Sequence, residues 1–217
     1  GIVTVDDAID VITEEAERDF AIMAATSPLE NSYFTTSVFT HTRKRIIWLL
    51  VLMISATFTG MIISHYEAAV AGLPILVSFI PMLMDTGGNS GSQASTIIIR
   101  GLATSEIRPN DILRVLFKEL RVSALIGLAL ALVNSVRMFI LYHGEEQILM
   151  LILTTGITLF FVVVMAKCLG CCLPIFAKVL HLDPAIMSSP VLTTICDAYA
   201  VALFFWIATR LLHIPVM

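Results

Sequence analysis

The chain has 217 residues and a formal net charge of −4, and 58% of its residues are hydrophobic while only 14% are charged. Its mean hydropathy is +0.92. Because soluble domains carry about 25% charged residues, this composition excludes a disordered protein and a secreted disulfide scaffold, and the negative charge argues against a nucleic-acid partner. A soluble fold cannot cover so much apolar surface, so we expect an all-α integral membrane protein.

The first twenty residues differ from the rest of the chain, because they contain seven acids and one base. Thr4 precedes Asp6 and Asp7, which is typical of an N-cap followed by acids at the positive end of a helix. Apolar residues recur at helical spacing until Pro28, which disfavours helix in the residue before it. No signal peptide opens the chain, so we interpret this region as part of a longer protein.

Five apolar blocks follow, each about as long as the roughly 20 residues that a helix needs to cross a bilayer. They span approximately residues 46–64, 68–103, 122–142, 148–180 and 185–212. The second block contains glycines and polar residues in its middle. We therefore expect five transmembrane helices, of which the second is broken.

Basic residues fall in alternate connections between these blocks. Before the first block, and between the second and third, they are Arg43, Lys44, Arg45, Arg100, Arg108, Arg114, Lys118 and Arg121. The connections between the first and second blocks and between the third and fourth contain no Lys or Arg. The positive-inside rule then predicts a multi-pass plasma-membrane protein with a cytoplasmic N-terminus and, after five spans, an external C-terminus.

The second block contains a long polar segment, and residues 81–96 read PMLMDTGGNSGSQAST. Asp85, Asn89 and Gln93 recur every four residues, which places one acid and two amides on the same helical face. Irregular backbone at membrane depth is tolerated only where it is buried in protein or lines a watery cavity, and broken helices commonly form transporter binding sites. The alternative is a small-residue face at which helices pack closely.

The fifth block contains an acid at depth. Asp197 lies thirteen residues after Pro184, which corresponds to roughly 20 Å of helix and to the middle of the membrane. Ser189 and Thr193 precede it by two turns and one turn on the same face, and Thr194 lies beside them. An ionisable side chain at this depth indicates a functional site by default.

Two further charged residues have structural or electrostatic interpretations. Lys167 lies deep in the fourth block, where it is a candidate ion-pair partner for Asp85 or Asp197, or a charge that shapes the field of a pore. Glu119 lies at the cytoplasmic edge of the third block, where a solvated acid is expected.

The four cysteines, Cys168, Cys171, Cys172 and Cys196, lie in apolar runs. Cysteines in such surroundings behave as small buried hydrophobic residues. Cys168 and Cys171 lie three residues apart on one helical face, so a site for a soft metal is an alternative. Two thiolates without a nearby His or acid make an incomplete site, however. No disulfide is implied.

The polar residues of the second and fifth blocks favour a pathway for a divalent cation. Mg²⁺ takes oxygen ligands, and the chain offers Asp197, Asn89, Ser92 and Thr193 together with main-chain carbonyls of the broken segment. One aspartate per chain is a weak charge for a divalent ion, but a homodimer with its axis beside the fifth block would bring two together. Because Mg²⁺ dehydrates reluctantly, it would pass largely hydrated and contact Asp197 through water.

Two other classes of protein are alternatives. Residues 88–91 read GNSG and fit the Gly-x-Ser-Gly of rhomboid proteases, but no histidine lies inside a later block to act as the base. Asp85 begins an Asp-Thr-Gly triplet like that of aspartic proteases, with Asp197 as its candidate partner, although the motifs of the intramembrane versions are absent. The remaining alternative is a membrane anchor or receptor subunit without transport, in which Asp197 would serve assembly.

Two long motifs resemble the signatures of one family. Residues 81–96, followed by RGLA at 100–103, resemble the second-helix signature of MgtE magnesium transporters. Residues 183–197 read DPAIMSSPVLTTICD and resemble the fifth-helix signature, and Lys118-Glu119 and Ala166-Lys167 also fit. The resemblance covers about residues 30–212 in order, and it extends to the eukaryotic solute-carrier relatives, which carry two such repeats.

The resemblance implies a Mg²⁺-selective, channel-like homodimer, not an enzyme, with a pore along the dimer axis between the second and fifth helices. Other divalent cations would pass with weaker effect. The metal-site positions it implies are Asp197, Thr193, Asn89, Gly88 and Ser92. The pore lining would add Asp85, Gly91, Gln93, Ser189 and Thr194.

The resemblance also implies a domain organisation. Family members carry a cytosolic helical domain and a pair of CBS domains that sense Mg²⁺ and close the pore through a connecting helix. Residues 1–4 then correspond to the tail of a CBS domain that this chain lacks, and residues 5–42 to the connecting (plug) helix and linker. Residues 43–217 would form the transmembrane pore domain, which moves Mg²⁺ into the cytoplasm.

Overall fold

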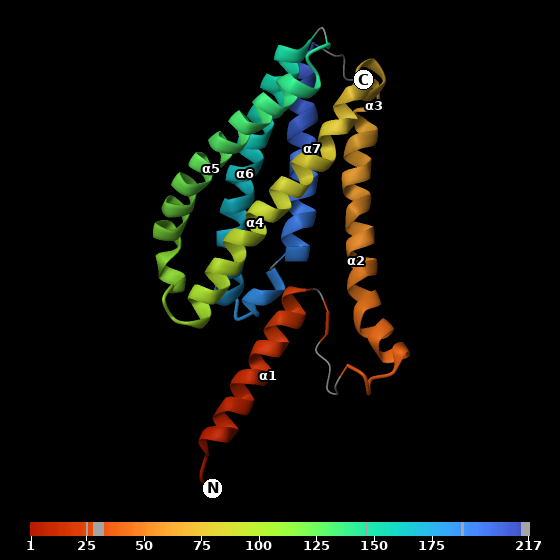
Figure 1. Cartoon of the computed structure of the whole chain (residues 1–217). Coiled ribbons are helices and arrows are strands. Elements are labelled where there is room, and N and C mark those ends of the chain that lie inside the picture. The colour runs from red at the N-terminus through yellow and green to blue at the C-terminus, as the bar shows by residue number, and fades with distance from the viewer. Residues whose placement is uncertain (25, 28–32, 146, 188, 214–217) are drawn as a thin grey trace.

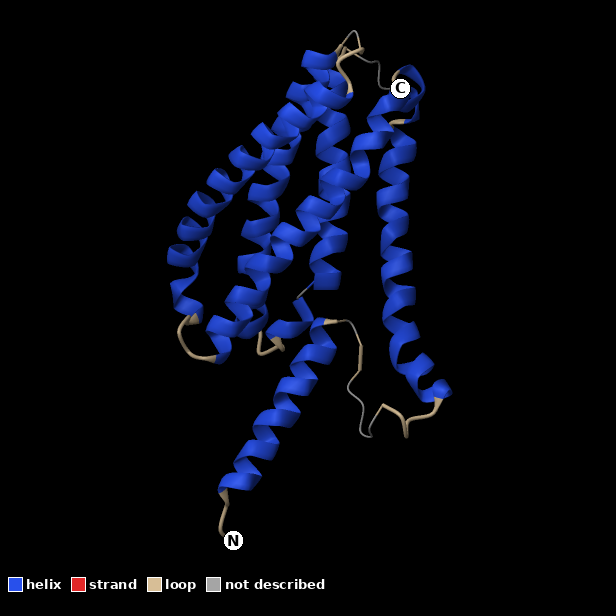
Figure 2. Cartoon of the chain, in the orientation of Figure 1, coloured by secondary structure: helices blue, strands red, loops and turns tan. Residues whose placement is uncertain are grey.

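The structure is a computed structural model that describes residues 1–24, 26–27, 33–145, 147–187 and 189–213. Every regular element among these residues is a helix (Figure 2). The α-helices are α1 (Val5–Met23), α2 (Val38–His65), α3 (Glu67–Gly72), α4 (Ile80–Ala103), α5 (Ile112–Leu141), α6 (Ile148–Val179) and α7 (Ser189–Leu211). The 3₁₀ helices are η1 (Pro74–Phe79), η2 (Pro109–Asp111) and η3 (Pro184–Met187).

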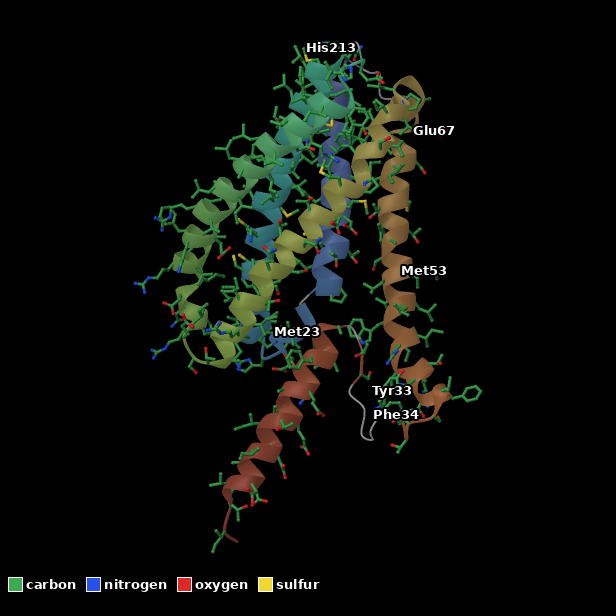
Figure 3. All side chains as sticks on the ribbon, viewed as in Figure 1. Met23, Tyr33, Phe34, Met53, Glu67 and His213 are labelled. Carbon is green, nitrogen blue, oxygen red and sulfur yellow. The ribbon has the colours of Figure 1, made fainter. Side chains whose placement is uncertain are left out.

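The five long helices α2, α4, α5, α6 and α7 run alternately in opposite directions through one bundle, and α1 extends from one end of it (Figure 1). Glu67 and His213 lie at one end of the bundle, whereas Met23, Tyr33 and Phe34 lie toward the other (Figure 3). The end near Met23 also carries the connection between α4 and α5 (Figure 1). This end therefore contains the bases of that connection.

Four segments of the described chain are long and apolar enough to cross a membrane. They are Val38–His65, Pro109–Leu141, Ile148–Val179 and Pro184–Leu211. The chain is thus a multi-pass membrane protein. Helix α4 is less apolar than these four segments because of its polar segment, although its 24 residues correspond to about 36 Å.

Helix α4 is continuous from Ile80 to Ala103, so the prediction of a broken helix through the polar segment is wrong. The helical path is interrupted earlier, at Leu73, whose backbone is not helical and which separates α3 from η1. An α-helix satisfies its own backbone groups in an apolar environment. The glycines that suggested a break instead allow α4 to approach its neighbours.

Three glycines show how closely the helices approach. A Cβ at Gly91 would lie 2.9 Å from Leu192 Cδ2 and 3.0 Å from Ala166 O, and a Cβ at Gly170 would collide with Gly91 O. A Cβ at Gly88 would collide with the Thr193 methyl group. Helix α4 therefore packs against both α6 and α7, and the small-residue packing face, considered as the alternative, is present.

A cluster of large apolar side chains fixes the end of the bundle where α4 begins. Phe79 and Phe204 are buried and meet edge to face, with ring centroids 6.5 Å apart. Tyr66 stacks on Phe205 at 5.1 Å. These rings hold the chain before α4 against the second half of α7, and they add to the stability that burial of apolar surface provides.

The predicted start of the N-terminal helix is confirmed. The Thr4 hydroxyl accepts a hydrogen bond from the Asp7 main-chain N–H at 3.3 Å, and the Thr4 N–H donates to Asp7 Oδ2 at 2.8 Å. This reciprocal capping box satisfies donors that a helix leaves unpaired at its start. The hydrogen bonds from Thr4 lower the pKa of the Asp7 carboxyl.

Gly170→Ala should lower the free energy of unfolding by about 1–3 kcal/mol, because the new methyl group has no room against the main chain of α4. Gly156→Ala in the same helix is the matched control, since its Cβ would lie 3.8 Å from Ser135 Oγ, an ordinary contact distance. Denaturant unfolding of both variants in the same detergent measures the difference. Equal stabilities would contradict a main-chain contact between α4 and α6.

Candidate functional site

One face of α4 presents polar side chains to the outside of the single chain. Asp85, Asn89 and Gln93 are all exposed, and Thr96 and Arg100 continue the line toward the end of the helix. The opposite face contains the packing glycines and is buried. The expectation that one acid and two amides share a helical face is confirmed, and we call Asp85, Asn89 and Gln93 the α4 polar stripe.

Asp197 is half-buried on α7 and lines a cavity of about 460 Å³. Thr193 and Thr194 line the same cavity, and their hydroxyl groups donate to Pro190 O at 3.3 and 3.0 Å. Met84 of α4 also contributes. Five residues of α2 complete the wall: Leu52, Ala56, Thr59, Gly60 and Ile63. The carboxylate thus lies in a space formed by three helices.

The charge of this region is negative. Met84, the residue before Asp85 on α4, lines the cavity together with Asp197, so the α4 polar stripe borders this cavity. Lys167 is only 4% exposed, and within the described chain no carboxylate lies at ion-pair distance from its ammonium group. The candidate pairing of Lys167 with Asp85 or Asp197 is therefore absent. Uncompensated carboxylates between helices attract cations.

The other predicted residues occupy different environments. Gly88 and Gly91 are buried in the contacts with α7 and α6 and do not lie on the α4 polar stripe. Ser92 is half-buried between these two faces. Ser189 begins α7, and its side chain lies outside the described part of the structure. Glu119 lines a separate cavity of about 240 Å³ beside the connection between α4 and α5.

The cysteines are in their free form. Cys171 and Cys196 are buried, and Cys168 and Cys172 are half-buried. The sulfur atoms of Cys171 and Cys172 lie 3.9 Å apart. Across the described residues, no three His, Cys, Asp or Glu side chains are grouped to hold a metal ion. Cys171 instead packs in an apolar cluster with Ile98, as expected for a small hydrophobic residue.

The geometry does not favour a serine protease. Ser90 is 6% exposed, inside the packed face of α4. His41, His65 and His143 lie at or beyond the ends of helices, as does His181. A serine nucleophile needs a histidine base within reach, and these positions provide none for Ser90.

Comparison with known proteins decides among the classes. The sequence model of MgtE, described as a divalent cation transporter, matches residues 80–207. The chain belongs to the MgtE family. This match contains both α4 and most of α7, which carry the polar stripe and Asp197. MgtE is a family of transporters and not of enzymes, so the protease alternatives are rejected.

Three curated relatives carry the description magnesium transporter MgtE. The proteins of Bacillus subtilis, Thermus thermophilus and Enterococcus faecalis are 33%, 32% and 31% identical to this chain over 213 residues. The similarity covers 98% of this chain but 46% of each relative. The chain therefore spans about half the length of the curated MgtE relatives that it matches.

The contribution of α2 to the cavity was not expected from the sequence. Thr59 is the buried residue of α2, and it lines the cavity beside Ala56 and Gly60. The apolar residues of α2 are spread around the helix rather than gathered on one face, so its sequence does not indicate which face packs inward. The small side chains at these positions were the remaining signal.

A second polar cavity of about 530 Å³ separates α1 from the ends of α4 and α6. The charged and titratable residues that line it are Glu15, Arg18, Asp19, Lys178, His181 and Asp183. Burial raises the pKa of Asp19, the carboxylates of Asp183 and Glu15 raise it further, and Arg18 opposes them. The docked position of α1 therefore disfavours an ionised Asp19.

The docking of α1 should weaken as the pH rises. Because the pKa of Asp19 is raised when α1 is docked, docking is fully favourable below the ordinary value of 3.8 and loses strength as the pH passes through the raised value. Asp19→Asn should remove this dependence and protect α1 more at neutral pH. Amide hydrogen exchange of residues 5–23 measures it, with Asp10→Asn as the control. Equal pH profiles for all three proteins would contradict the expectation.

Proposed function

We propose that this chain is the membrane-spanning part of a Mg²⁺ transporter, in which the ion passes between two copies of the chain. The observation that carries the proposal is the α4 polar stripe beside Asp197, exposed on an otherwise apolar bundle. Lipid does not solvate an acid and two amides at this depth. A second copy of the chain that faces this stripe, together with water, solvates these side chains and forms a polar path.

Helix α4 is then a further span, in addition to the four apolar ones. It runs through the bundle beside α6 and α7 (Figure 1), and its length of about 36 Å exceeds the roughly 30 Å of the hydrocarbon core. Its polar composition follows from its place at the dimer axis, where it faces water. The chain therefore crosses the membrane five times, and the connection between α4 and α5 lies in the cytoplasm because it is basic.

Asp197 is the first ligand of the ion. Two copies bring two carboxylates to the axis, which together balance the charge of one divalent cation. Mg²⁺ keeps several of its waters, so the carboxylates contact it through water. A site that binds the hydrated ion in this way also admits other divalent cations, with weaker effect.

The remaining residues act around this ion. Asn89, Ser92 and Gln93 offer side-chain oxygens along α4, and Thr193, Thr194 and Ser189 continue the polar surface on α7. Gly88 and Gly91 act by position, because they let α4 approach Thr193 and Leu192. Lys167, buried on α6, contributes its field rather than a contact.

The N-terminal region has a regulatory place in this proposal. Residues 1–4 end a CBS domain, residues 5–42 connect it to the pore, and residues 43–217 form the pore. The curated relatives are about twice as long as this chain, which supports the presence of cytosolic sensor domains in the whole protein. Mg²⁺ moves into the cytoplasm of the cell through the plasma membrane.

Asp197→Ala should reduce Mg²⁺ uptake into proteoliposomes by roughly tenfold or more, because a carboxylate a few ångströms from a cation contributes several kcal/mol even when screened. Asp111→Ala, outside the bundle, is the control at matched protein and dimer content. Asp197→Glu tests charge alone and should retain part of the flux. Equal flux in Asp197→Ala and the control would reject the pore ligand.

If neither protein conducts while both remain folded dimers, Mg²⁺ binding replaces flux as the measurement. Isothermal titration calorimetry of the chain and of Asp197→Ala then compares their affinities. Equal affinities would reject the proposed ligand, and a lower affinity in the variant would support it.

The proposed dimer axis predicts a pattern of crosslinks. A photo-crosslinking residue at Asn89 should join two chains in membranes, because the α4 polar stripe faces its copy. The same residue at Leu132, exposed on α5, should leave the chain monomeric on denaturing gels. If only the residue at Leu132 gave crosslinked dimers, the dimer axis would lie beside α5 and not beside the α4 polar stripe, and the proposal would be contradicted.

A further inference from the structure

A straight line of exposed side chains runs along α5. It begins with three bases, Arg114, Lys118 and Arg121, and continues with Leu125, Leu128 and Leu132. Their spacings of four, three, four, three and four residues keep all six on one helical face. The line therefore changes from cationic to apolar within a single surface, which we call the α5 lipid stripe.

The bases of this stripe are exposed, and Arg114 and Lys118 also line a cavity together with Glu106, Asp111 and Glu119. The side chain of Arg114 is 89% exposed, and its Nη1 lies 4.0 Å from Asp111 Oδ1, which is a long ion pair. The guanidinium of Arg121 lies 4.6 Å above the Phe117 ring, and its Nε donates to Phe117 O at 3.3 Å. Arg121 is thus positioned on the helix surface rather than paired with a carboxylate. Such bases at a membrane boundary attract anionic headgroups.

The apolar part of the stripe opens into a groove between α5 and α6. The groove has a volume of about 350 Å³, and Leu128 and Leu132 form its α5 wall together with Ala131 and Ser135. On α6 its wall includes Gly156, Phe160 and Phe161. Gly156 leaves the depth of the groove open, since a Cβ there would have no neighbour closer than 3.8 Å.

This face is remote from the proposed ion path. Helices α5 and α2 lie on opposite flanks of the bundle (Figure 1), and the cavity with Asp197 is lined by α2, α4 and α7. The α5 lipid stripe therefore faces the surrounding bilayer, at the end of the bundle that carries the basic connection. Its occupant comes from the leaflet on that side.

We propose that the α5 lipid stripe binds one anionic phospholipid, with the phosphate at Lys118 and Arg121 and one acyl chain in the groove between α5 and α6. Charge complementarity selects an anionic headgroup. The rise along the helix places Leu128 and Leu132 about 10 and 16 Å beyond Arg121. That span matches the roughly 15 Å depth of one leaflet of hydrocarbon, so a single lipid reaches both parts of the site.

Native mass spectrometry of the delipidated chain in detergent tests the site, with dioleoyl phosphatidylglycerol and dioleoyl phosphatidylcholine as probes. The chain should retain one phosphatidylglycerol in preference to phosphatidylcholine. Lys118→Gln with Arg121→Gln should weaken phosphatidylglycerol binding by about thirtyfold. Arg43→Gln, which removes an exposed base of α2, is the matched charge control and should leave it unchanged.

The groove is tested separately from the headgroup. Gly156→Leu fills it and should weaken binding of both lipids, and Phe161→Ala removes an exposed part of its wall and should do the same without filling it. Equal binding of the two lipids by the unmodified chain, or equal losses in Arg43→Gln and the α5 variant, would overturn the proposal. Loss of the dimer in Gly156→Leu with unchanged lipid binding would assign the groove to a second copy and overturn it as well. Each result is independent of Mg²⁺ transport.

Discussion

The main-chain contact between α4 and α6 at Gly91 and Gly170 determines how the rest of the bundle is arranged. Two helices approach this closely only where neither carries a side chain at the crossing. Because Gly88 and Gly91 lie on the same face of α4, the contact with α6 and α7 buries that face and turns the polar face outward. The position of every polar residue on α4 follows from this orientation.

The amino-acid sequence predicted the α4 polar stripe because helical spacing is local. Asp85, Asn89 and Gln93 share a face in any α-helix, so their arrangement needs no knowledge of the neighbours. The N-cap at Thr4 was predictable for the same reason, since it depends on hydrogen bonds within one turn. The four apolar spans were predictable from length and composition.

The continuity of α4 was not predictable in this way. Glycine lowers helix propensity, but it also permits close packing, and the sequence alone does not say which effect prevails. The partners that decide it, Ala166 and Gly170 on α6 and Leu192 and Thr193 on α7, are distant along the chain. The separation of Lys167 from Asp197 likewise depends on how α6 turns within the bundle.

Helix α2 has a mechanical consequence for the cavity that contains Asp197. It packs mainly against α7, and Thr59 is its buried residue, whereas α4, α6 and α7 share an extensive core. Apart from Ile62, Ile63 and the adjoining Tyr66, which pack against that core near one end, α2 shares little buried apolar surface with the rest of the chain. The wall formed by Ala56 and Gly60 is therefore held by fewer contacts within the chain than the walls formed by α4 and α7, and a change in the position of α2 would change the width of this cavity.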